Sequence, residues 1–126
     1  MRENVSKLIN YKNEYGYIRT VFYFIDKENT GGEWDFKSQE DWNLNPNLTY
    51  VYNGTKLRYD DIGNIHYGCV GRVLFSRDIL LMAGGVIQIL NKTSRLYFIK
   101  SNFDDPRDQW AINFGSDIWE RILNYE

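Results

Sequence analysis

The chain has few of the residues that build disulfide bonds and metal clusters. Its 126 residues include a single cysteine, Cys69, and a single histidine, His66. One cysteine excludes an internal disulfide and a zinc site made of cysteines alone. One histidine beside it leaves too few ligands for a structural zinc cluster. The sequence therefore predicts no metal site and no cofactor.

Long apolar runs and an excess of positive charge are missing as well. No apolar run approaches the length that crosses a bilayer, and the first residues, Met1 to Ser6, lack the apolar core of a signal peptide. The net charge is −2 and the isoelectric point about 5.4, so no basic field gathers nucleic-acid phosphates. We expect synthesis in the cytoplasm without a signal peptide, with secretion or delivery by another route. A small RNA-cleaving site stays open.

Aromatic residues, in contrast, are abundant, at 17% of the chain. A chain of 126 residues is long enough to bury a core of its own, so residues 1–126 are expected to form a single domain. Part of the aromatic surface must lie in that core, because aromatic rings carry large buried areas. Another part is available to line a ligand groove, and the sequence leaves both uses open.

Periodicity and turn signals predict an α+β domain that is predominantly helical. A hairpin is expected over residues 48–59, because Asn53-Gly54 suits a tight type I′ turn between two alternating segments. A helix over about 77–90, with Ser76 as its N-cap, is apolar nearly all round and is expected to be central. The other expected elements are helices over Ser6–Tyr15, Tyr17–Lys27 and 106–124 and a short strand over Arg95–Ser101.

A glycine-rich polar segment, 60–71, is the most informative stretch of the chain. Its three glycines around polar side chains predict a shaped loop or the start of a helix that presents those side chains. His66 has the only side chain here whose ordinary pKa lies near neutrality. It is either a structural histidine or a catalytic one. Asp61 and Asn64 are suited to orient an imidazole, a water or a sugar hydroxyl. Cys69 is expected to be buried and unreactive.

Two further polar motifs flank this segment. In Trp34-Asp35-Phe36-Lys37 the aromatic rings are expected to bury. Asp35 and Lys37 then form either a surface ion pair of little value or a site in which the aromatics raise the pKa of Asp35 and Lys37 lowers it. In residues 104–109, Asp105 before Pro106 is a good helix start, and capping competes with a role in a site.

Taken in order, the three motifs resemble the bacterial polymorphic toxin type 44 domain, over roughly Val21 to Ile118. Members of that family are typically toxic modules of large secreted proteins, used against competing bacteria and neutralised by a cognate immunity protein. The family pattern also accepts asparagine at the position of His66, which makes His66 less secure as an indispensable base. The motif residues that match by position are Trp34, Asp35, Lys37, Asp61, Gly63, Asn64, Tyr67, Gly68, Gly71, Asp105, Pro106, Asp108 and Gln109.

The leading hypothesis from the sequence is a glycan-cleaving toxin that acts on peptidoglycan. Glycoside cleavage needs a protonated and an ionised carboxyl group, and Asp35 is assigned as the acid and Asp61 as the base or nucleophile. The side chains expected to bind substrate are Trp34, Asn64, Tyr67, Asp105, Asp108 and Gln109.

Two alternatives belong to other classes. In a metal-independent ribonuclease, His66 takes the 2′-hydroxyl proton of RNA and Lys37 stabilises the phosphorane. In a non-enzymatic module, tryptophans and tyrosines bind a carbohydrate or a protein partner. The oligomeric state is not encoded in any pattern of the chain.

Overall fold

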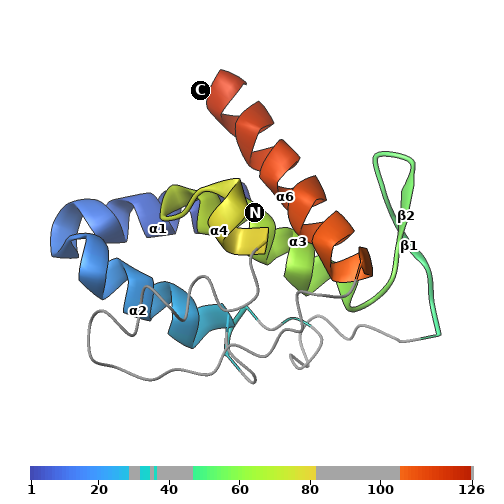
Figure 1. Cartoon of the computed structure of the whole chain (residues 1–126), viewed down its shortest axis with the longest axis horizontal. Coiled ribbons are helices and arrows are strands. Elements are labelled where there is room, and N and C mark those ends of the chain that lie inside the picture. Colours follow the sequence, from blue (N-terminus) through green and yellow to red (C-terminus); the bar gives the residue numbers. More distant parts are fainter. Residues whose placement is uncertain (29–31, 35, 37–46, 82–105, 126) are drawn as a thin grey trace.

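The computed structural model describes residues 1–28, 32–34, 36, 47–81 and 106–125. Over these residues the fold is predominantly helical with one two-stranded antiparallel sheet, which confirms the predicted α+β class (Figure 1). None of the helices within these ranges is long and apolar enough to cross a membrane. The elements in chain order are α1 (Arg2–Tyr15), α2 (Tyr17–Glu28), β1 (Tyr50–Tyr52), β2 (Thr55–Leu57), α3 (Asp61–Val70), the 3₁₀ turn η2 (Gly71–Val73), α4 (Arg77–Leu81) and α6 (Pro106–Tyr125).

Helices α1 and α2 pack against each other and bury one apolar face each (Figure 1). Gly16 joins them with φ 84°, a backbone conformation that glycine adopts without strain. Val5 and Leu8 of α1 and Phe24 and Ile25 of α2 are buried in the common core. Helix α1 was predicted from its apolar spacing and begins earlier than that spacing indicated. Helix α2 was predicted from the length of its apolar run.

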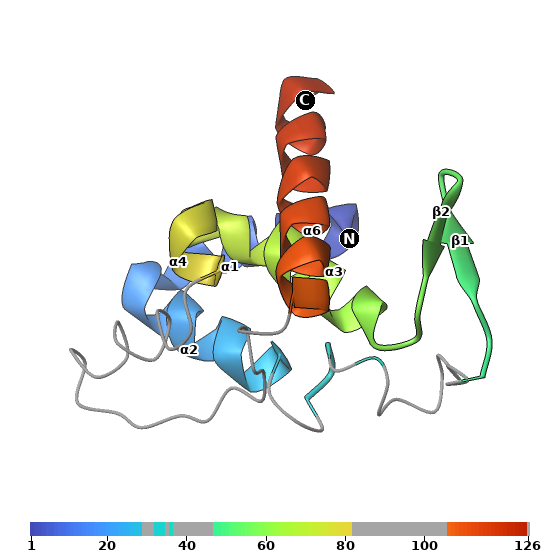
Figure 2. The same ribbon diagram turned by 45° about the vertical axis from the view of Figure 1, so that its right-hand side comes forward.

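The predicted hairpin is confirmed as β1 and β2, which project away from the helices (Figures 1 and 2). Tyr50 pairs with Leu57 and Tyr52 with Thr55, so the connection is the dipeptide Asn53-Gly54. Both turn residues have positive φ, 47° and 81°, as a type I′ turn requires. Leu57 is buried, and the hairpin is thereby anchored on the helical body.

Helix α3 lies at the centre of the described part of the chain and crosses α6 at very short range (Figure 2). A Cβ added at Gly68 would lie 2.2 Å from the carbonyl oxygen of Ile112, and one at Gly115 would lie 1.9 Å from that of Ile65. Only glycine at both positions permits this approach. Segment 60–71, predicted as a loop or a helix start, forms helix α3. Gly68 is required for close packing, since its φ is not positive.

The helix predicted over 77–90 is described as far as Leu81, where it is α4. Its N-cap is as predicted, since the Ile79 backbone N–H donates to Ser76 Oγ at 3.3 Å. Residues 82–90 and the strand predicted over Arg95–Ser101 lie outside the described residues. The last helix is confirmed as α6, whose stripe of Ile118 and Ile122 is buried.

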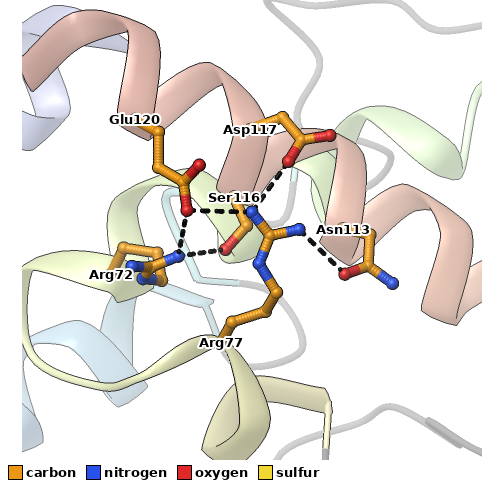
Figure 3. Close-up of polar contacts among 6 residues, drawn as sticks. All are labelled: Arg72, Arg77, Asn113, Ser116, Asp117 and Glu120. Carbon is orange, nitrogen blue, oxygen red and sulfur yellow. Dashed lines mark hydrogen bonds and ion pairs between the residues drawn. The ribbon is translucent and has the colours of Figure 1, made fainter. Parts of the chain in front are cut away.

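Two arginines tie the segment after α3 to α6 (Figure 3). Arg77 donates to Asp117 Oδ1 at 2.7 Å and to Glu120 Oε1 at 3.0 Å. Arg72 donates to the same Glu120 oxygen at 3.2 Å and to Ser116 Oγ at 3.0 Å. The two arginines, Arg77 first, lower the pKa of Glu120. The network lies at the surface, so it adds orientation more than stability.

The crossing of α3 and α6 makes a stability prediction. Gly115→Ala should lower the free energy of unfolding by about 1–3 kcal/mol, because the new methyl group overlaps the backbone of α3. Gly63→Ala is the matched control, since a Cβ at this helical position meets nothing within 4 Å and alanine has the higher helix propensity. Urea unfolding followed by circular dichroism measures both. A Gly115→Ala protein as stable as the wild type would contradict the packing argument.

Candidate functional site

A pocket of about 340 Å³ lies between the hairpin, the start of α1, the first half of α3 and the middle of α6. Its described lining is apolar and aromatic, apart from the side chains of Asn4 and His66, and includes no Lys, Arg, Asp or Glu. Its size and its small number of polar groups are typical of a small-molecule or substrate site. The aromatic residues that line it are Phe36, Tyr50, Tyr52 and Phe114.

His66 forms a buried pair with Glu28 at the wall of this pocket. Its Nδ1 lies 2.8 Å from Glu28 Oε1, and the two side chains are only 3% and 5% exposed. Glu28 comes from the last turn of α2 and His66 from the middle of α3. A buried glutamate is stable only with a partner, and here the imidazole is that partner. Such a carboxylate orients the ring and leaves its other nitrogen to face a substrate.

That other nitrogen, Nε2, contacts Asn4 of α1. Asn4 Nδ2 lies 2.8 Å from Nε2, and both residues line the pocket. An ionised carboxylate only accepts hydrogen bonds, so Nδ1 must donate to Glu28. In the neutral ring Nε2 then carries the lone pair, and the amide NH₂ of Asn4 donates to it. His66 can therefore act as a general base toward the pocket when the amide of Asn4 turns away and gives up this lone pair to a substrate or a water.

Two aromatic rings of the Trp34-Asp35-Phe36-Lys37 motif cover the imidazole of His66. The ring centroids of Trp34 and Phe36 lie 5.0 Å and 4.9 Å from that of His66. Both side chains are buried, as the sequence predicted, but Trp34 lies in a turn and packs on α2, while Phe36 lines the pocket. Asp35 and Lys37 lie outside the described residues.

Asp61 contacts Arg107 of the polar motif at residues 104–109 and does not line the pocket. Arg107 Nε donates to Oδ1 at 3.0 Å, its Nη2 donates to Oδ2, and the Arg58 backbone N–H donates to Oδ2 at 2.7 Å. The carboxylate is 1% exposed, and it raises the pKa of Arg107. Both oxygens are thus engaged in holding the start of α3 to the start of α6. The side chain does not line the pocket and is almost fully buried, so Asp61 is not placed to act on a substrate there.

The remaining predicted substrate residues also hold helices together. Asn64 donates to Asp108 Oδ1 at 2.9 Å, which links α3 to α6. Gln109 donates to the carbonyl oxygen of Leu81 at 2.7 Å, which links α6 to α4. Tyr67 is buried and stacks on Phe24. Asp105 lies outside the described residues.

The Tyr67 phenol and the Cys69 thiol of α3 are both buried and both lose their protons less readily than when exposed. Burial raises the pKa of the Tyr67 phenol, and the charge of Glu28 adds to the rise. Burial also raises the pKa of the Cys69 thiol to about 11, so the thiolate is scarce at neutral pH, as the sequence led us to expect. Among the described residues, no three side chains of His, Cys, Asp or Glu come together as metal ligands.

Sequence reasoning missed Glu28 and Asn4. Glu28 had one local signal, since a glutamate at the C-terminus of a helix opposes the helix dipole and needs another reason to be there. Asn4 had none, because an asparagine near the start of a helix is commonplace.

The Asp61–Arg107 pair makes a prediction that separates structure from chemistry. Asp61→Asn should lower the free energy of unfolding by about 1–3 kcal/mol, because the arginine loses its charged partner. Its folded fraction should keep the activity of the wild type. Asp117→Asn, in an exposed pair with Arg77, is the control and should cost less than about 1 kcal/mol. A stable Asp61→Asn protein without activity would restore Asp61 as a catalytic group.

Comparison with known proteins adds a family to this geometry. Residues 23–121 match the family described as Bacterial toxin 44. The match includes Glu28, His66 and the Asp61–Arg107 pair, whereas Asn4 precedes it. Searches of curated proteins and of solved structures found no match. Because the match covers most of the chain, this protein belongs to the bacterial toxin 44 family and carries a bacterial toxin domain.

Proposed function

We propose that this toxin domain hydrolyses the glycan strands of peptidoglycan, with the pocket beside His66 as its substrate site. The observation that carries the proposal is a buried glutamate–histidine pair at the wall of an aromatic pocket whose described lining includes no Lys, Arg, Asp or Glu side chain. A pair of this kind supplies acid–base chemistry, and the lining selects the class of substrate.

The lining favours a neutral, ring-shaped substrate. Tyr50 and Tyr52 offer flat apolar faces together with hydroxyl groups, a combination that suits the faces and the hydroxyls of a sugar. Polyanions such as RNA are normally held by Lys and Arg, and the described lining has neither. A glycan strand therefore fits the pocket better than a phosphodiester.

The reaction that we propose uses His66 as the general base. Its Nε2 takes a proton from a water whose oxygen attacks the anomeric carbon, while the glycosidic oxygen leaves with a proton from an acid. Asp35, the residue before Phe36, remains our assignment for that acid. Glu28 orients the imidazole and stabilises its protonated form. His66 thereby replaces Asp61, whose oxygens are engaged by Arg107.

The setting follows from the same activity. A wall hydrolase harms a competitor from outside the inner membrane, so we propose that the domain acts after delivery into target bacteria. A producing cell then needs protection of its own wall. We propose a cognate immunity protein as the partner that supplies it.

A ribonuclease is the second candidate, because the Glu28–His66 pair suits it equally well. There Nε2 of His66 takes the proton of a ribose 2′-hydroxyl, whose oxygen attacks the adjacent phosphorus and displaces the 5′ oxygen of the next nucleotide, which leaves with a proton from a water molecule. Lys37 is our assignment for the cation that stabilises the phosphorane. The lack of Lys and Arg side chains in the described lining is the observation that ranks this candidate second.

Substitution of the pair tests its catalytic role. His66→Asn and Glu28→Gln keep the approximate size of each side chain but remove the base and the orienting charge. We expect hydrolysis to fall by about 10²–10⁴-fold for His66→Asn, the usual value of general acid–base catalysis. Glu120→Gln, an exposed carboxylate on α6, should keep wild-type activity.

Mass spectrometry of products from bacterial sacculi, with total RNA in a parallel tube, measures all three variants. Fragmented RNA beside intact sacculi would replace the first candidate with the second. Full activity of a folded His66→Asn protein on either substrate would overturn the role of the pair, and asparagine at this position in the family pattern makes that variant the sharpest one.

The cellular compartment of toxicity gives an independent test. Expression with export to the periplasm should arrest a bacterial host, and expression without export should not, because the glycan lies outside the inner membrane. Growth curves and cell morphology measure the effect, with His66→Asn as the inactive control. Toxicity confined to the cytosol would favour the ribonuclease, and harmlessness in both compartments would favour a binding module.

A further inference from the structure

We infer that Asn4 is a positioning residue that tunes how readily His66 takes up a proton. The inference rests on the proposed function for its catalytic consequence, while its effect on the ring stands on geometry alone. Asn4 Nδ2 lies 2.8 Å from Nε2, the nitrogen that we assign as the base.

Glu28 and Asn4 act on the imidazole in opposite directions. The carboxylate of Glu28, 2.8 Å from Nδ1, stabilises the positively charged ring in a buried setting. The amide NH₂ of Asn4 can donate only to an unprotonated Nε2, so it stabilises the neutral ring. The rings of Trp34 and Phe36 cover the imidazole and add no charge. Two opposed polar partners therefore set the proton affinity of Nε2.

Helix α1 holds Asn4 in place. Val5 and Leu8, on the same helix, are 3% and 0% exposed, so the first turns of α1 are fixed against the core. In both views the start of α1 lies beside α3 (Figures 1 and 2), and the two helices are in contact. Because α1 precedes the residues that match the family, this control belongs to an element outside the family pattern.

Substitution of Asn4 separates its effect from that of Glu28, because the amide NH₂ of Asn4 is the group that favours the neutral ring. Aspartate at this position would partner the protonated ring alone. Leucine would partner neither, and the opposition to Glu28 would be lost.

The test uses Asn4→Leu and Asn4→Asp in the full chain, with Asn10→Asp as control. Asn10 is exposed on the same helix, so the control repeats the charge change away from the ring. His66 is the only histidine, so ¹⁵N NMR of histidine-labelled protein reports its ring nitrogens without ambiguity. The pH at which Nε2 becomes protonated should rise by about one pH unit in both Asn4 variants. It should not change in Asn10→Asp.

The acid limb of the pH–activity profile should move with the NMR midpoint. Unchanged midpoints in folded Asn4 variants would overturn the inference. Asn4→Leu decides the matter, because it only removes the donor, whereas the new carboxylate of Asn4→Asp attracts the proton by itself. Asn4→Ala takes its place if Asn4→Leu fails to fold. Shifted midpoints in a protein that hydrolyses neither sacculi nor RNA would support the inference while refuting the proposed function, so the two failures are distinguishable.

Discussion

Where α3 crosses α6, Gly68 and Gly115 each leave room for a backbone carbonyl of the opposite helix. A methyl group at either position would overlap that carbonyl, so the approach exists only because both residues are glycine. The Asp61–Arg107 pair and the Asn64–Asp108 hydrogen bond then fix the two helices in register. Helices α1 and α4 and the 3₁₀ turn η2 pack against this pair of helices, because α3 contacts α1 and η2 and α6 contacts α4.

The helical repeat places the side chains of α3 on two faces, one toward α6 and one toward α1 and α2. Asp61, Asn64 and Gly68 recur at three- and four-residue intervals and lie on the face toward α6. His66 lies on another face, where α1 and α2 supply its partners. One short polar segment, 60–71, thereby contributes both to the contact between α3 and α6 and to the buried pair at the pocket. Asp61 and Asn64 belong to the helix contact, and His66 belongs to the buried pair.

Short-range patterns predicted the elements well. The Asn53-Gly54 turn, the Ser76 cap, the apolar spacing of α1 and α6 and the length of the apolar run of α2 are all local signals, and each predicted element is present in the structure. Segment 60–71 was predicted only in part, since α3 does begin there, at Asp61, but continues through Gly63 and Gly68. Its glycines suggested a loop or a helix start, but the residues that Gly68 must accommodate lie on α6, far along the chain. Composition cannot tell a glycine needed for packing from one needed for a positive φ.

The sequence by itself determined the helical class, the hairpin, the burial of Trp34 and Phe36, the inert cysteine and the resemblance to a toxin family. Only the tertiary structure decided what His66 does. Its partners Glu28 and Asn4 lie 38 and 62 positions away, on two other helices. Local patterns encode hydrogen bonds and burial within one element, whereas a contact across three helices exists only after the helices have packed. The same packing engaged the carboxylate of Asp61 with Arg107 and left the imidazole of His66 at the pocket.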